Sequence, residues 1–313
     1  MNKVLKTLKK VLFILILVLI IFTFSGYIYL YVLPKGPEIT EKTTLKNESD
    51  TFVMYAYDDS ERKSIKVWTY KPKDWENGDK FLFVMHGGGR NADDYLNAWK
   101  EIADKNKILV VAPEFKNKFA KYTTNDYQEG NLFTFFGSEN PKEEWAYEVI
   151  ENIFDRIKTT NGFTNKTYDI FGHSAGGQFV HRMIMLMPEA RIRNAVAANA
   201  GFYTFPDENL EYPYGLKNTP VPLDNSLKDS FKKHLIILLG ENDNDPRLGT
   251  FRETELAMKQ GANRLERGSN FYKEASELTK EESLVFNWEI DTVRNVGHNY
   301  KKMSSQAVKY FVN

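Results

Sequence analysis

The sequence contains no cysteine, which excludes disulfide bridges, thiolate nucleophiles and cysteine-ligated metal centres. It also lacks an excess of either charge, because 42 lysines and arginines balance 42 aspartates and glutamates. Because the chain has no net charge of either sign, it produces no overall electrostatic attraction for nucleic acid, and no nucleic-acid partner is expected. Histidine is scarce, with five residues, and this leaves few choices for a general base.

A long apolar run is present near the N-terminus, where residues 11–33 read VLFILILVLIIFTFSGYIYLYVL without a charge. As a helix this run would extend roughly 35 Å, enough for the ~30 Å hydrocarbon core of a bilayer. Four lysines precede it, at positions 3, 6, 9 and 10, whereas the following flank mixes lysine with glutamate. This bias predicts a cytoplasmic N-terminus and an outward-facing remainder in the cell membrane.

A cleaved signal peptide is the alternative interpretation of the same run. Its apolar core would normally span about 7–15 residues and end at a small-x-small site. Here TFSG is the one candidate site, and YIYLYVL continues the run beyond it. The length favours a signal anchor, and cleavage would instead yield a secreted protein.

The remaining chain divides into a stalk and one folded domain. Residues 1–10 form the predicted basic cytoplasmic tail and residues 11–33 the transmembrane anchor. Residues 34–50 are polar, contain two prolines and show no apolar period, which is typical of a linker. The folded domain is expected over residues 51–313.

The domain alternates short apolar runs with amphipathic stretches. FLFVMH at 81–86 and ILVVAP at 108–113 are typical of buried parallel strands, and the stretch between them has helical spacing. Further strands are expected at 51–57, 64–70, 167–171, 194–200, 234–240 and 285–292, and further helices over 141–158, from Ser174, near 251–280 and from Tyr300. The pattern predicts an α/β fold with one mostly parallel sheet covered by helices on both faces.

Two stretches, 118–140 and 201–226, interrupt this rhythm and are dense in tyrosine and phenylalanine. Long irregular segments in compact domains are usually lids or binding loops. These two are therefore the predicted walls of a substrate pocket.

The sequence GHSAGG at 172–177 lies between a predicted strand and a predicted helix. A G-x-S-x-G match alone is weak, because small residues produce it often by chance. The strand-turn-helix context strengthens it, since Gly172 and Gly176 occupy positions where a tight turn leaves no room for a Cβ. The pattern predicts that Ser174 is a nucleophile at the carboxyl edge of the sheet.

A serine hydroxyl needs a base, and the base needs an orienting acid. His298, in RNVGHNY, is the histidine that lies in a loop after the last predicted strand. The acid is expected in ENDNDP, directly after the strand at 234–240. Asp243 is the first choice and Asp245 the alternative, because Asp245 abuts Pro246 and is biased toward extended backbone. The chain order Ser, acid, His is typical of one hydrolase fold.

The glycine-rich loop HGGGRN at 86–91 follows a predicted strand. Successive N–H groups of Gly88 and Gly89, together with that of Ala175, could hold an oxyanion. A phosphate cradle or a plain loop are the alternatives, although the Gly-Lys-Ser/Thr of a P-loop does not follow.

Three motifs together, HGGGRN, GHSAGGQFVHRM and VGH, resemble the α/β-hydrolase superfamily. NADDYLNAW, VVAPEF and AVAANAGFYTFPD resemble its bacterial esterase branch, which is related to polyhydroxybutyrate depolymerases and feruloyl esterases. The resemblance covers about residues 64–312 and implies the α/β-hydrolase fold with a Ser–Asp–His mechanism through an acyl-enzyme. In this chain Ser174, Asp243 and His298 would carry it. Relatives of this type are generally secreted and often disulfide-bonded, whereas this chain has no cysteine and an apparent anchor.

These observations predict a membrane-tethered serine hydrolase that cleaves small-molecule or polymeric carboxylic esters without a metal or cofactor. A peptidase or an acyltransferase on the same fold is the alternative chemistry. A binding protein that keeps the fold without turnover is the alternative class. The oligomeric state is not predicted.

Overall fold

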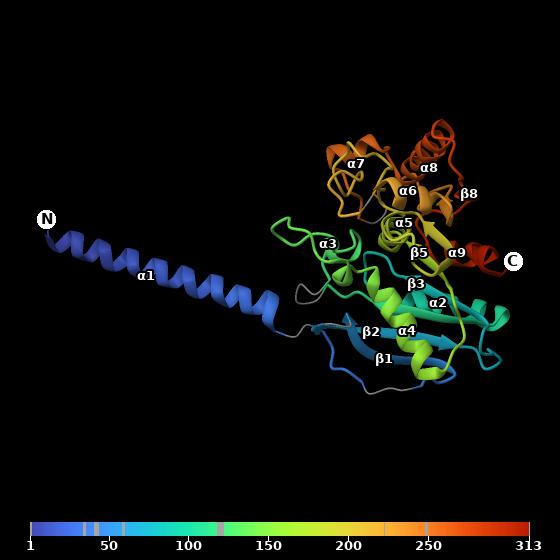
Figure 1. Cartoon of the computed structure of the whole chain (residues 1–313), viewed down its shortest axis with the longest axis horizontal. Helices are drawn as coiled ribbons and strands as arrows, with labels where there is room; N and C mark the ends of the chain where they lie inside the picture. Colours follow the sequence, from blue (N-terminus) through green and yellow to red (C-terminus); the bar gives the residue numbers. More distant parts are fainter. Residues whose placement is uncertain are drawn as a thin grey trace.

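A computed structural model describes residues 2–33, 36–40, 44–57, 60–117, 122–221, 223–247 and 250–312. Parts of the predicted stalk and of the first aromatic stretch, at 34–35, 41–43 and 118–121, lie outside the described residues. Helix α1 (Asn2–Tyr27) continues into a π-helical turn (Ile28–Val32) and projects away from the domain that follows (Figure 1).

Helix α1 has the length and composition of a membrane span. The most apolar 18-residue window of the candidate span Lys3–Tyr27 has a mean hydropathy of 2.5 and is 0% buried inside the molecule. An exposed apolar surface of this size is unfavourable in water. The helix is therefore a candidate anchor, although a signal sequence near the N-terminus would have the same character.

One sheet of eight strands organises the domain, in the order β1-β2-β4-β3-β5-β6-β7-β8. The strands are β1 (Glu48–Tyr57), β2 (Ser60–Lys71), β3 (Lys80–Met85), β4 (Ile108–Glu114), β5 (Tyr168–His173), β6 (Ile192–Ala198), β7 (His234–Gly240) and β8 (Glu289–Val293). The pairs β1–β2 and β2–β4 are antiparallel, and every pair from β4 to β8 is parallel. The carboxyl ends of six strands consequently meet at one edge, where ligands bind in open α/β sheets.

Helices cover both faces of this sheet, as the alternation of the sequence predicts. They are α2 (Ala92–Asn106), α3 (Thr124–Tyr127), α4 (Glu148–Asn161), α5 (Ala175–Leu186), α6 (Leu223–Phe231), α7 (Glu255–Lys259), α8 (Arg264–Glu281), α9 (Tyr300–Ala307) and α10 (Lys309–Val312). One apolar cluster includes side chains of α4, α5, α6 and α8, and a second includes those of α2, α9 and α10. The predicted α/β-hydrolase fold is confirmed.

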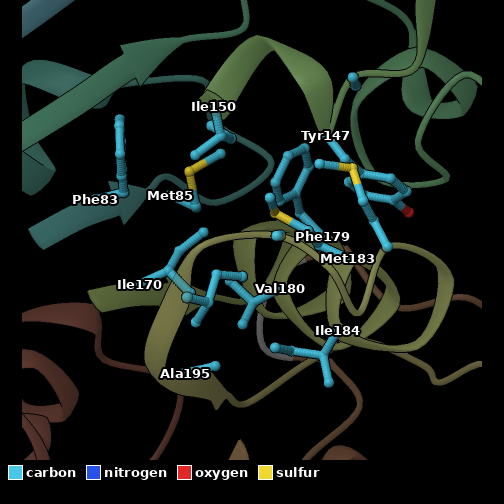
Figure 2. Close-up of a cluster of buried hydrophobic side chains, with 14 of the residues drawn as sticks. Phe83, Met85, Tyr147, Ile150, Ile170, Phe179, Val180, Met183, Ile184 and Ala195 are labelled. Atoms are coloured by element: carbon cyan, nitrogen blue, oxygen red, sulfur yellow. The ribbon is translucent and has the colours of Figure 1, made fainter. Parts of the chain in front are cut away.

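Helix α5 is buried over its whole length and fixes the turn that precedes it. Its apolar side chains pack between the sheet and helix α4, as Figure 2 shows for Phe179, Val180, Met183 and Ile184 beside Met85, Ile170, Tyr147 and Ile150. Burying a side chain of this size contributes about 1.5–3 kcal/mol. The helix that begins directly after Ser174 is therefore held rigidly against β3 and β5.

The folded domain begins earlier than the predicted start at residue 51, because β1 begins at Glu48. Leu45 is buried in the core, and its N–H donates to Asn161 Oδ1 at 2.8 Å. Further upstream the Ser64 hydroxyl donates to the carbonyl of Pro37 at 2.6 Å. The described part of the predicted stalk thus lies against the domain, since its apolar and backbone groups find partners there.

Three other elements differ from the sequence prediction. The helix expected over 141–158 begins at Glu148, after a 3-10 turn at Lys142–Glu144. Helix α6 begins inside the stretch that was expected to be irregular. Strand β8 begins at Glu289 instead of residue 285, because Trp288 turns into the core and its Nε1–H donates to the carbonyl of Ser230 at 2.9 Å.

Candidate active site

Ser174 lies at the sharp turn between β5 and α5, with φ 59° and ψ −114°. This positive φ is strained for a residue with a side chain, and such strain is typical of functional turns. Two glycines make the turn possible by close approach. A Cβ on Gly172 would lie 2.1 Å from the Gly176 carbonyl oxygen, and a Cβ on Gly176 would lie 2.2 Å from that of Met85.

His298 and Asp243 meet at the same edge of the sheet. Asp243 follows β7, His298 follows β8, and His298 Nδ1 lies 2.7 Å from Asp243 Oδ2. The Asp243 side chain is 0% exposed and that of His298 is 15% exposed. A buried hydrogen bond of this kind fixes the orientation of the imidazole.

A buried arginine completes the surroundings of Asp243. Arg264 Nη1 lies 3.4 Å from Asp243 Oδ1, and Arg264 is 1% exposed. Burial lowers the pKa of this guanidinium, whereas the Asp243 carboxylate opposes that shift. The pair leaves Asp243 with a partner on each oxygen. No sequence motif identified Arg264, because helix α8 brings it to the site from 21 residues beyond Asp243.

The alternative acid, Asp245, lies elsewhere. Its carboxylate forms a bidentate pair with Arg247, with Nε–Oδ1 and Nη2–Oδ2 distances of 2.9 and 2.8 Å. Hydrogen bonds from Arg247 lower the pKa of Asp245 to about 2. The structure brings Asp243, and not Asp245, to His298.

The other four histidines have separate structural partners. His86 Nε2 accepts the N–H of Phe115, and burial lowers the pKa of His86 to about 3. His181 is also buried and accepts the N–H of Thr204, while His234 lies between Asn194 and Glu289. His173 is buried directly before Ser174, and burial holds its pKa well below the ordinary value.

The glycine loop after β3 faces the serine turn. A Cβ built on Gly87 would lie 3.6 Å from Ser174 Cβ, while one on Gly88 would meet open space. Within the described part of the chain, no acceptor takes the N–H of Gly88, Gly89 or Ala175. The loop that the sequence singled out thus has free donors near Ser174, although Gly87 was not among the predicted residues.

Tyr95 of helix α2 links the glycine loop to the serine turn. Its hydroxyl lies 3.0 Å from His173 Nδ1, and a Cβ built on Gly87 would lie only 2.7 Å from the same oxygen. The ring of Tyr95 stacks on the ring of Tyr300, with centroids 4.3 Å apart. Tyr300 is two residues after His298 in the chain. Sequence reasoning missed Tyr95, because nothing in NADDYLNAW distinguishes it from an ordinary core tyrosine.

We expect Tyr95→Phe to lower the free energy of unfolding by about 1–3 kcal/mol, because buried His173 would lose its partner. Urea unfolding of the full chain in detergent, followed by tryptophan fluorescence, measures the change. The matched control is Tyr55→Phe at an exposed position, which should remain within about 0.5 kcal/mol of the parent. Equal stability of both variants would contradict the role of the Tyr95 hydroxyl.

The two aromatic stretches form core packing more than pocket walls. Tyr122, Tyr127, Phe202, Tyr203 and Phe205 are all buried. The ring of Tyr127 stacks on Phe115, and its hydroxyl donates to the His86 carbonyl at 2.7 Å. Residues 206–209 of the second stretch line a cavity of about 570 Å³ together with α6 and α8. The prediction of pocket walls therefore agrees with the structure at 206–209, whereas the buried aromatic side chains pack in the core, because composition does not distinguish packing from lining.

Comparison with proteins of known structure also indicates a hydrolase. The sequence matches no protein-family model and no curated protein. Poly(aspartic acid) hydrolase-1 from Sphingomonas sp. KT-1 is 38% identical and has a TM-score of 0.81, and the match covers 86% of this chain and 100% of that one. LpqC, a poly(3-hydroxybutyrate) depolymerase from Bordetella parapertussis, is 28% identical with a TM-score of 0.79, covering 83% of this chain and 87% of that one.

A more distant structure shares the fold alone. A fluorophosphonate-binding serine hydrolase of Staphylococcus aureus is 14% identical with a TM-score of 0.55, and the match covers 85% of this chain and 100% of that one. The level of identity to the Sphingomonas protein, over its whole length, shows common family membership. The chain therefore belongs to the α/β-hydrolase family of serine esterases and depolymerases that includes poly(aspartic acid) hydrolase-1.

Proposed function

We propose that the protein is a membrane-tethered, outward-facing hydrolase of carboxylic esters with Ser174, Asp243 and His298 as its catalytic triad. The observation that carries the proposal is the 2.7 Å hydrogen bond between His298 Nδ1 and buried Asp243, at the sheet edge that also presents Ser174. The same three side chains are those that the sequence order selects.

The triad acts through the second nitrogen of His298. Because Nδ1–H donates to Asp243, Nε2 is unprotonated and free to take the proton of Ser174. The serine oxygen then attacks the substrate carbonyl and forms a tetrahedral intermediate. The Asp243 carboxylate stabilises the imidazolium that results, and Arg264 contacts the other oxygen of that carboxylate.

The negative charge on the carbonyl oxygen is held by backbone donors. The N–H of Ala175 at the start of α5 and those of Gly88 and Gly89 are the proposed oxyanion hole. Collapse of the intermediate transfers the proton from His298 to the leaving alcohol and leaves an acyl group on Ser174. Water activated by the same imidazole then releases the acid.

Esters are the first choice of substrate. Poly(3-hydroxybutyrate) is a polyester, and the poly(3-hydroxybutyrate) depolymerase LpqC is similar to this chain over most of the length of both proteins. Amides are a second choice, because the more similar relative is named for poly(aspartic acid), a polyamide. Both reactions pass through the same acyl-enzyme and differ in the leaving group.

A pair of substrates with one acyl group separates the two choices. We expect the full chain to hydrolyse p-nitrophenyl butyrate with a higher kcat/KM than butyryl p-nitroanilide, and a fluorophosphonate to abolish both activities. Preference for the anilide would favour the amide hydrolase. Absence of turnover and of labelling would leave a binding protein with a hydrolase fold.

The proposed topology is supported by the length of α1 and by the lysines before the apolar run. The absence of native cysteine permits a direct test. We expect a membrane-impermeant maleimide to label Val285→Cys on intact cells and to spare Asn2→Cys. The reverse pattern would contradict the outward orientation, and release of the V285C protein into the medium would indicate cleavage.

A further inference from the structure

Two adjacent phenylalanines protrude from the domain between α3 and α4. Phe135 is 89% exposed and Phe136 is 83% exposed. The edge of one ring contacts the face of the other, with centroids 5.3 Å apart and an interplanar angle of 84°. Large aromatic side chains rarely remain in water at this exposure, so a contiguous pair indicates a contact surface.

The backbone holds the pair at the tip of a tight turn. The N–H of Thr134 donates to the Ser138 carbonyl at 2.7 Å, and that of Gly137 donates to the Thr134 carbonyl at 3.0 Å. Gly137 has φ 82°, a left-handed conformation that glycine adopts without strain. The five residues from Thr134 to Ser138 carry no charge. The turn therefore presents an uncharged aromatic tip in a fixed conformation.

The membrane tether enters the domain at the carboxyl edge of the sheet. Lys66 of β2 pairs with Glu114, the last residue of β4, and β2 runs antiparallel to β4. Ser64 therefore lies just beyond the carboxyl end of β4, and its hydroxyl binds the Pro37 carbonyl. The chain from α1 consequently reaches the domain at the edge that presents Ser174.

The segment that links α1 to the domain is short. The helical part ends at Val32, and Pro37 is already bound to Ser64. Five residues reach at most roughly 17 Å when fully extended. If α1 spans the bilayer, this edge of the domain is confined to the membrane surface.

The aromatic tip lies at the same edge. The segment 115–147 connects the carboxyl end of β4 to the start of α4, which crosses back over the sheet. In Figure 1 the green segment between α3 and α4 projects from the domain toward the side on which α1 lies.

We propose that Phe135 and Phe136 insert into the interface of the outer leaflet, as a second membrane contact beside α1. This inference rests on the tether in the proposed function. Burial of the two rings would contribute about 1.5–3 kcal/mol each. A tip without charges is suited to a neutral lipid surface, such as phosphatidylcholine. The contact would hold the edge with Ser174 facing the bilayer.

The test uses the full chain in phosphatidylcholine vesicles with one introduced cysteine and an environment-sensitive nitrobenzoxadiazole label. Ser138→Cys places the label beside the tip, and the same change with Phe135→Ser and Phe136→Ser removes the aromatic rings around it. Val285→Cys is the control at the opposite edge, since Val285 is 59% exposed and precedes β8. Vesicle flotation reports the tether independently.

We expect the S138C label to emit at shorter wavelength, to be quenched by headgroup-level nitroxide lipids and to be protected from iodide. The S138C/F135S/F136S and V285C labels should remain accessible to iodide. Flotation with equal iodide access at all three positions would overturn the lipid contact and leave the tether intact. Failure to float would overturn both. Fluorophosphonate labelling of the parent protein reports catalysis separately, so its loss would count against the triad alone.

Discussion

Ser174→Ala is expected to abolish fluorophosphonate labelling and to lower kcat for ester hydrolysis by about 10⁶-fold, the scale measured when a triad serine is removed. The physical reason is that no other hydroxyl occupies the turn between β5 and α5, which is the position of the proposed nucleophile. Alanine retains a Cβ, so the strain at φ 59° is unchanged and the fold should be preserved. Single-turnover hydrolysis of p-nitrophenyl butyrate measures the change.

Ser138→Ala is the matched control, because Ser138 is an exposed serine on the same edge of the domain. It should label and turn over like the parent protein. Urea unfolding of the Ser174→Ala protein separates loss of chemistry from loss of fold. Labelling of Ser174→Ala at the parental level would show that the probe reacts with another residue, and it would contradict the proposed nucleophile.

The sequence predicted the strands of the parallel sheet well, because buried strands are short continuous apolar runs. It also gave the three positions of the proposed triad, since the carboxyl ends of parallel strands share one edge whatever lies between them. Ser174, Asp243 and His298 follow β5, β7 and β8, so their positions after parallel strands place all three at one edge of the sheet. Local pattern and topology sufficed to predict that shared edge.

The supports of the site depend on contacts between distant residues, and local pattern does not reveal these. Tyr95 reaches His173 across 78 residues, and Arg90 donates to the Phe115 carbonyl from a turn with φ 57°. The prediction of a stalk over residues 34–50 did not include contacts with the domain, for the same reason. Leu45 reads as an isolated apolar residue in a polar linker, yet it packs beside helix α4 and is bound by Asn161.

The choice between Asp243 and Asp245 shows where sequence reasoning stops. Both follow β7 within one short loop, and the argument from Pro246 gave only a preference. The structure separates them by a turn in which the N–H of Asp243 donates to the Gly240 carbonyl at 3.0 Å. That turn directs Asp243 inward to His298 and Arg264, whereas Asp245 pairs with Arg247 at the surface.

Asp243→Asn should therefore lower kcat/KM for ester hydrolysis by about 10⁴-fold, whereas Asp245→Asn should change it less than about twofold. Asparagine has nearly the same shape, but its amide N–H would face Nδ1 of His298. The imidazole would then carry its proton on Nε2, the tautomer that cannot accept the serine proton. A pH–rate profile of each variant with p-nitrophenyl butyrate measures the effect.

The two variants also differ in stability, and this distinguishes a catalytic effect from an unfolded protein. Asp243→Asn leaves buried Arg264 without its carboxylate, so its free energy of unfolding should fall by about 3–5 kcal/mol, as when one partner of a buried pair is removed. Asp245→Asn breaks only an exposed pair and should leave the free energy of unfolding close to that of the parent protein. Fluorophosphonate labelling of folded Asp243→Asn should be slow but still specific to Ser174, because the nucleophile and its oxyanion donors remain in place. A 10⁴-fold loss in Asp245→Asn with Asp243→Asn fully active would transfer the acid to Asp245 and require a rearranged loop in the active enzyme.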